Sequence, residues 1–123
     1  MRKIKLVVPV ARSDKHFSKD PNDYTPVMVE GWRYENAAGE AVAITKGVGE
    51  DEDKWFVRDI PTGYVCHSSG YTRRKDAEYW ADIFIGKLQY FRAHNPELNE
   101  ALVNVRLELE KRFGSYTRDR EAQ

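Results

Sequence analysis

The chain has 123 residues, 41% of them hydrophobic and 12% aromatic, which is enough packing material for one domain with its own core. Its 20 Lys and Arg residues balance 20 Asp and Glu residues, which argues against a generic polyanion binder, because such binding relies on excess positive charge. A single cysteine excludes an intramolecular disulfide, and no apolar run is long enough for a membrane span. We therefore expect one soluble domain, residues 1–123, with a frayed tail at 115–123, no membrane partner and a reducing, cytoplasmic environment.

Charge is distributed unevenly along this neutral chain. Residues 1–20 carry six cations and two anions. Further along, Glu50, Asp51, Glu52 and Asp53 form an acidic run. The run lacks the alternating ligand spacing and the glycine of an EF-hand loop, so it does not predict a calcium site. It is either a solvated hairpin tip or an acidic contact for a basic partner, and the surface as a whole is predicted to be polarised.

The amino-terminal region predicts one strand followed by a long loop. Apolar residues alternate from Ile4 to Val10, which is typical of a strand, and Pro9 favours an edge position because proline cannot donate to the ladder. Residues 12–26 are rich in turn-forming residues without a sustained period, so they predict a long loop.

Two hairpins follow in the sequence. Val27–Tyr34 and Glu40–Val48 have the β-branched, aromatic and alternating residues of strands, and residues 35–39 form the turn between them. The second hairpin pairs Lys54–Ile60 with Tyr64–His67 across a Pro-Thr-Gly turn. With the first strand, these segments predict an antiparallel sheet of four to five strands.

Two helices are predicted after Thr72. The first shows one apolar face made by Ala77, Trp80, Ala81, Phe84, Leu88 and Phe91. Further apolar residues widen that face, so we expect this helix to lie between the sheet and a second helical layer. Asn95 and Pro96 predict the start of the second helix, whose apolar stripe ends at Gly114. Strands followed by two C-terminal helices predict an α+β fold.

The sequence shows no catalytic constellation. Cys66 and His67 are adjacent, and neighbours on a strand point to opposite faces, which argues against a nucleophile–base pair. The three histidines are dispersed, and no glycine pattern for nucleotides occurs, so we expect neither a metal nor a cofactor. An enzyme built from distant residues remains an alternative; the residues for it would be His16, Asp59, His67 and Tyr71.

The basic start of the first helix is the first candidate contact site. Arg73, Arg74 and Lys75 stand at the positive end of the helix dipole, which is electrostatically unfavourable. The preceding loop is rich in hydroxyl groups, from Ser68, Ser69 and Thr72. Its backbone donors and the free amides of the helix start could receive a phosphate or a carboxylate. The alternative is a solvated helix start that nearby carboxylates neutralise.

The sheet aromatics are the second candidate. Trp32, Tyr34, Trp55 and Phe56 lie on predicted strands that also carry Arg33, Lys46, Lys54 and Arg58. If some of these aromatics face outward beside the cations, they form a stacking or hot-spot surface. The alternative is that they pack in the core.

The segment from Lys54 to Phe84 resembles, in its strand-turn-strand-helix order, the sheet-plus-helix DNA-binding domains of the integrase arm-binding type. Such domains lay sheet residues, often Arg and Trp, in the major groove. The resemblance covers about a quarter of the chain, which adds another long helix and lacks the basic excess of such domains. It does not assign the chain to that family.

Together these features predict a non-enzymatic interaction module, a regulator or inhibitor of the kind found among accessory proteins of mobile elements, with a protein as its partner. The alternative is a nucleic-acid-binding protein that uses the sheet aromatics and the basic helix start. The chain is expected to be a monomer or a homodimer through its last helix, where Val103 and Leu107 flank the apolar stripe.

Overall fold

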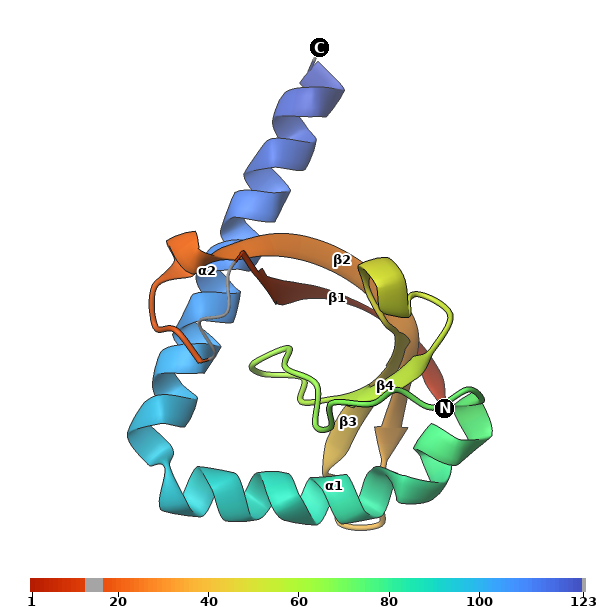
Figure 1. Cartoon of the computed structure of the whole chain (residues 1–123). Coiled ribbons are helices and arrows are strands. Elements are labelled where there is room, and N and C mark those ends of the chain that lie inside the picture. The colour runs from red at the N-terminus through yellow and green to blue at the C-terminus, as the bar shows by residue number, and fades with distance from the viewer. Residues whose placement is uncertain (13–16, 123) are drawn as a thin grey trace.

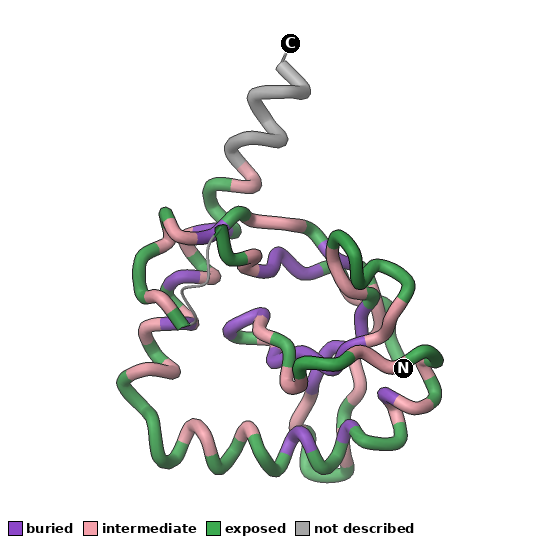
Figure 2. Tube along the Cα trace, viewed as in Figure 1, coloured by how far each residue is buried: buried purple, intermediate pink, exposed green. Residues whose placement is uncertain are grey.

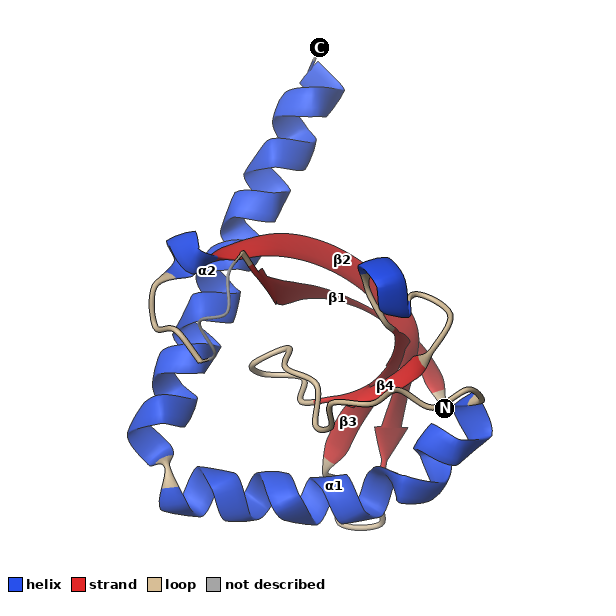
Figure 3. Cartoon of the chain, viewed as in Figure 1, coloured by secondary structure: helices blue, strands red, loops and turns tan. Residues whose placement is uncertain are grey.

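The computed structural model describes residues 1–12 and 17–122. It has the predicted α+β fold, with one four-stranded antiparallel sheet in the order β1-β2-β3-β4 and two C-terminal helices (Figure 1, Figure 3). The elements are β1 (Arg2–Ala11), β2 (Tyr24–Glu35), β3 (Ala41–Lys46), β4 (Trp55–Arg58), α1 (Arg74–His94) and α2 (Pro96–Ala122), with short 3-10 helices η1 (Pro21–Asp23) and η2 (Gly49–Asp51). Within the described part of the chain, no helix is long and apolar enough to cross a membrane.

The first strand lies at an edge of the sheet, as Pro9 predicts. Pro9 pairs with Pro26 of β2, so two residues without a backbone donor face each other in the ladder. The loop predicted for residues 12–26 is too long, because β2 begins at Tyr24 and its strand residues continue the pairing with β1. Its remaining part includes residues 13–16, and with them His16, which lie outside the described residues.

The first predicted hairpin is confirmed as β2 and β3. Its turn is held by Asn36, whose side-chain oxygen accepts hydrogen bonds from the backbone N–H groups of Ala38 and Glu40 at 3.0 and 2.9 Å. Gly39 closes the turn with a φ of 82°, a conformation that favours glycine.

The second predicted hairpin is wrong in its return strand. Residues 64–67, all of them described, do not form a strand beside β4; the pairing is reduced to isolated bridges at Arg58↔Val65 and Trp55↔Tyr71. Between the bridges the imidazole of His67 takes the place of a backbone carbonyl, because its Nε2 accepts the N–H of Val57 at 3.0 Å. A side chain therefore interrupts the fifth strand.

His67 is a structural residue of this edge. Its Nδ1 donates to the backbone oxygen of Ser69 at 2.8 Å, so both ring nitrogens are engaged in the neutral form. The ring stacks between Phe56 and Phe84, with centroid distances of 5.3 and 4.9 Å. Burial lowers the pKa of His67 below its ordinary value of 6.5.

The free energy of unfolding should therefore fall as the pH drops below 6.5, the ordinary pKa of His67. In this pH range His67 binds a proton in the unfolded chain but not in the folded chain. The free energy of unfolding stops falling once the pH is below the lowered pKa of His67 in the folded state. Urea denaturation at a series of pH values measures this effect. His67→Gln should flatten the dependence of the free energy of unfolding on pH in this window. Equal slopes for His67→Gln and the parent would contradict the assignment.

Both helices pack on the same face of the sheet. By strand register, Val7, Ile44 and Val57 share one face. Ile44 and Val57 belong to a buried cluster with the α1 residue Phe84, whereas Val7 lies in a second cluster with Val105 of α2. Figure 2 shows buried positions recurring along α1 between exposed ones. The helices thus cover different parts of this face, and the strip between them stays open.

The expected helical layering is wrong, because α2 packs directly on β1 and β2 instead of covering α1. The wide apolar surface of α1 is consequently left exposed on its outer side. The second helix also continues past its predicted end at Gly114 to Ala122.

The opposite face of the sheet is curved around the segment that follows β4 (Figure 1). Arg58 lies there, only 6% exposed, and donates to Thr45 Oγ1 at 3.0 Å and to the oxygen of Gly63 at 2.8 Å. A Cβ on Gly63 would lie 2.8 Å from Pro9 Cδ and 3.3 Å from Val8 Cα, so this segment reaches from β4 to β1. Arg58 therefore links the segment that follows β4, which we call the closing segment, to the concave face of the sheet.

Candidate functional site

The open strip of the helix-bearing sheet face forms a cleft of about 380 Å³. Its lining comes from β1, β2 and β4: Lys3, Ile4, Lys5, Glu30, Gly31, Trp32 and Trp55. Lys3 is paired with Trp32 and Lys5 with Glu30 in the β1–β2 register, so these side chains share a face. The cleft is therefore a product of strand pairing and of the separation of the two helices.

Positive groups stand over the rings of both tryptophans. Lys3 Nζ is 5.7 Å from the ring centroid of Trp32, and the guanidinium carbon of Arg74 is 4.9 Å from the same ring. Lys46 Nζ is 4.7 Å from the ring centroid of Trp55. Such contacts stabilise by about 0.5–1 kcal/mol each at exposed sites, and they hold the cations in place. We call these five residues together with Lys5 the tryptophan–cation surface.

The tryptophan–cation surface has more cations than carboxylates. Lys5 Nζ lies 3.5 Å from Glu30 Oε1, with both side chains more than 70% exposed, so solvent screens that pair. Arg74 Nε lies 3.0 Å from Glu78 Oε1 at the start of α1. Lys3 and Lys46 add positive charge that is directed over aromatic rings. The surface is therefore suited to an acidic group that also offers apolar or aromatic contact.

An acidic segment borders this surface. Glu50, Asp51, Glu52 and Asp53 are exposed and connect β3 to β4, as expected of a hairpin tip. Lys46 and Trp55 flank the segment on its two strands, and Lys46 Nζ donates to the backbone oxygen of Asp53 at 3.4 Å. Opposite charges thus lie side by side, with Trp55 at their border.

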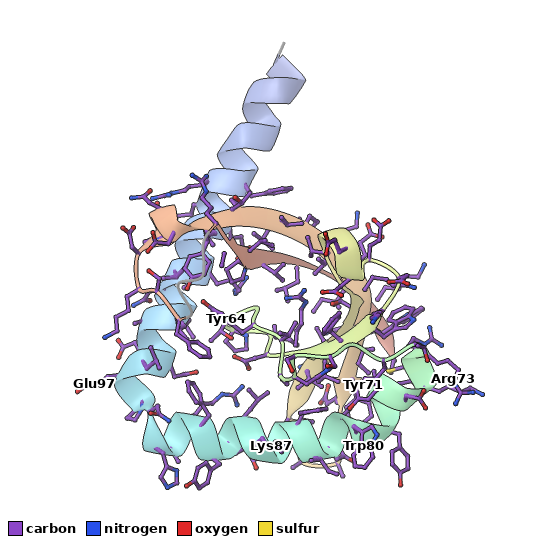
Figure 4. The ribbon with its side chains drawn as sticks, in the orientation of Figure 1. Tyr64, Tyr71, Arg73, Trp80, Lys87 and Glu97 are labelled. Carbon is purple, nitrogen blue, oxygen red and sulfur yellow. The ribbon has the colours of Figure 1, made fainter. Side chains whose placement is uncertain are left out.

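The structure brings together parts of the two candidate sites that the sequence suggests. Arg74, from the basic helix start, lies on Trp32, from the sheet aromatics. Arg73 is exposed beside them, with its Nε 3.4 Å from Asp76 Oδ2, and it points outward from the start of α1 in Figure 4. Lys75 is exposed on the next position of the helix.

Other sequence candidates lie elsewhere. Arg58 is buried, and Arg33 lies on the opposite face of the sheet, where it pairs with Glu35. Phe56 is in the core, and the hydroxyl of Tyr34 donates to Asp82 of α1 at 2.9 Å. The hydroxyl residues of the loop before α1 are exposed outside the tryptophan–cation surface; they are Ser68, Ser69 and Thr72.

Sequence reasoning missed Lys3 and Lys5 as members of the site. They alternate with apolar residues on β1, which marks them as one face of a strand. Their position over the cleft depends on the β1–β2 register, which joins segments on either side of a long loop. The alternation on β1 can be read from the sequence, but the strand with which β1 pairs cannot.

Asp59 and Cys66, two of the residues considered for catalysis, lie in structural surroundings. Asp59 is 3% exposed and accepts hydrogen bonds from Arg92 at 2.5 Å and from the Thr62 hydroxyl at 2.7 Å. Burial raises the pKa of the Cys66 thiol to about 12, which keeps it protonated and weakly nucleophilic at neutral pH. In the described residues, no group of three or more His, Cys, Asp or Glu side chains is placed to hold a metal ion.

Comparison with known proteins finds no match for this chain among protein-family models, curated proteins or solved structures.

Proposed function

We propose that this protein is a non-enzymatic interaction module, a regulator or inhibitor, that binds another protein through the tryptophan–cation surface. The observation that supports this is that cations from β1, β3 and α1 stand over two partly exposed tryptophan rings around one cleft. Trp and Arg are enriched among the residues that dominate binding energy at protein interfaces. Because the cations are already held on the rings, binding loses less side-chain entropy.

The neighbouring acidic segment favours a protein partner. A protein can present both signs of charge and so complement Lys3 and Arg74 together with the run from Glu50 to Asp53. A nucleic acid carries only negative backbone charge and is repelled by that run. The partner surface we propose therefore has carboxylates facing the lysines and arginines, and basic residues facing the acidic segment.

A second candidate is single-stranded nucleic acid. Two tryptophans in a cleft rimmed by lysines are the elements that such proteins use for base stacking and backbone contact. The balanced charge of the chain and the acidic border make this the weaker proposal. We place the action of the protein in the cytoplasm, where Cys66, its single cysteine, would stay reduced.

The two proposals differ in one capture experiment. The tagged protein is incubated with lysate of its native host, with and without nuclease, at about 0.1 and 0.5 M salt, which span weak and strong screening of surface charge. We expect one protein to be retained after nuclease treatment and at the lower salt, and to be lost from a Trp32→Ala/Trp55→Ala variant. Loss of all captured material with nuclease would instead support the nucleic-acid proposal.

A further inference from the structure

The outer side of α1 carries large apolar side chains that the fold leaves uncovered. Tyr79, Trp80, Ile83 and Tyr90 are 76, 40, 48 and 67% exposed. Tyr79, Ile83 and Tyr90 recur at helical spacing on the side opposite the buried residues Ala77, Ala81 and Phe84. At about 150–250 Å² per aromatic side chain, the exposed aromatic area is roughly 300–450 Å² per chain. Patches of this size on a soluble domain commonly mark interaction sites.

Gly86 lies in the middle of this stripe. It is exposed, and a Cβ built on it would meet nothing within 4 Å, so no contact within the chain requires glycine there. A glycine inside a helix costs roughly 0.5–1 kcal/mol relative to alanine. A glycine on a helix surface allows the backbone of another helix to approach closely. Its position between Ile83 and Tyr90 is therefore explained by a second helix crossing α1 at Gly86.

We infer that the second helix is α1 of another copy of this chain, packed antiparallel about a two-fold axis at Gly86. In that register two residues oppose each other when they are equally far before and after Gly86. Tyr79 then faces Ala93, which is a large side chain opposite a small exposed one. The hydroxyl of Tyr90 faces the carboxylate of Asp82, a donor opposite an acceptor.

Charge at the ends of the stripe agrees with the same register. Lys75, exposed at the start of α1, and Glu97, exposed at the start of α2, are both eleven positions from Gly86. Because α1 ends at His94 and the chain then turns into α2, Glu97 lies at the corner just beyond the end of α1, and the two-fold axis brings the start of the other copy's α1, with its Lys75, to that corner. Figure 4 shows Glu97 at the corner between α1 and α2, pointing away from the sheet. A parallel arrangement would place lysine beside lysine.

The expected interface can be compared in area and polarity with the interfaces of stable dimers. A standard interface buries about 800 Å² per partner, with an apolar centre and a polar rim. The exposed aromatic residues of α1, Trp80 included, supply about 300–450 Å² of that area, and the remainder comes from Ile83 and from the polar and charged residues that flank them along α1. The alternative dimer through α2 has less to bury, because Leu107, at 43%, is the one large exposed apolar residue among the α2 side chains that the structure describes, which end at Gly114. This inference does not depend on the proposed function.

Light scattering coupled to size exclusion tests the inference on the intact chain. We expect the parent to have twice the mass of one chain, and Ile83→Glu to be monomeric with a dissociation constant raised roughly 100-fold or more, because its carboxylate would be desolvated. Leu107→Glu is the matched control and should remain a dimer. A monomeric parent at its highest soluble concentration, or a dimer that only Leu107→Glu disrupts, would overturn the proposal.

Cysteine cross-linking tests the antiparallel register in a Cys66→Ala background. Gly86→Cys should form a disulfide with its own copy, because the axis passes through this position. Tyr79→Cys should not, because the two copies of residue 79 are about 21 Å apart along the helices, whereas mixing it with Ala93→Cys should yield a mixed disulfide. Cross-linking of Tyr79→Cys to itself would show a parallel arrangement and contradict the register.

Discussion

Arg73→Glu combined with Arg74→Glu should abolish capture of the partner while the chain stays folded, with only a small loss of stability. In the native chain, Arg74 lies on Trp32 and beside Glu78. A glutamate at this position would place negative charge against both the ring face and the carboxylate of Glu78. The acidic group that we propose on the partner would then meet repulsion in place of attraction, which costs several kcal/mol.

Stability should fall by no more than about 1–2 kcal/mol, because partly exposed ion pairs are worth about 0–1 kcal/mol each and the contact of Arg74 with Trp32 about 0.5–1 kcal/mol. Acidic residues at the start of a helix also interact favourably with its dipole, which offsets the lost pairs. Lys111→Glu with Arg112→Glu is the matched control, since it makes the same change of net charge on α2. Light scattering should give both double variants the same molecular mass as the parent. Normal capture by the first variant, or equal loss by the control, would contradict the role of the surface.

Gly31→Ala should lower the free energy of unfolding by about 3 kcal/mol and the melting temperature by about 10–20 °C. A Cβ at this position would lie 2.0 Å from the backbone oxygen of Ile44 and 2.9 Å from Thr45 Cα. Backbone atoms cannot rotate away as a side chain can, so the β2–β3 pairing at Gly31↔Thr45 must open. Thr45 is fully buried and accepts a hydrogen bond from Arg58, so the disturbance reaches the inside of the sheet.

The same substitution at Gly86 is the control for this prediction. A Cβ there meets open space, so Gly86→Ala should raise the stability of α1 by about 0.5–1 kcal/mol. Both changes are made in an Ile83→Glu chain, which keeps association through α1 out of the comparison. Thermal unfolding followed by circular dichroism gives the difference. Equal melting temperatures for Gly31→Ala and its parent would contradict the close approach of β2 and β3.

Much of the fold could be predicted because its signals are local. The helical period after Thr72, the proline in the first strand and the turn at residues 35–39 each depend on a few neighbouring residues, and each is confirmed. The return strand at residues 64–67 fails because His67 replaces a backbone acceptor, and no local pattern distinguishes such a side chain from a strand residue. The position of α2 depends on packing with β1, at the other end of the sequence.

The candidate site was only partly predictable for the same reason. Trp32 and Arg74 are recognisable as an aromatic strand residue and a cation at a helix start, but their contact joins distant segments. Arg58 and Arg33 were expected beside the exposed aromatics, but they lie on the other face of the sheet. Alternation along a strand separates its two faces, but it does not show which of them the helices cover. The excess of apolar residues on α1 could be read from the sequence. The expectation that α2 covers them was wrong.

Hydrogen exchange on the captured complex tests most directly the claim that the tryptophan–cation surface binds a protein. If it does, amide exchange should slow on partner binding at residues 3–5, 30–32 and 46–55 and at the start of α1. Amide exchange in the middle of α2, around Arg106 and Glu110, should stay as in the free protein. Protection confined to that part of α2, with unchanged exchange across residues 30–32 and 46–55, would contradict the account.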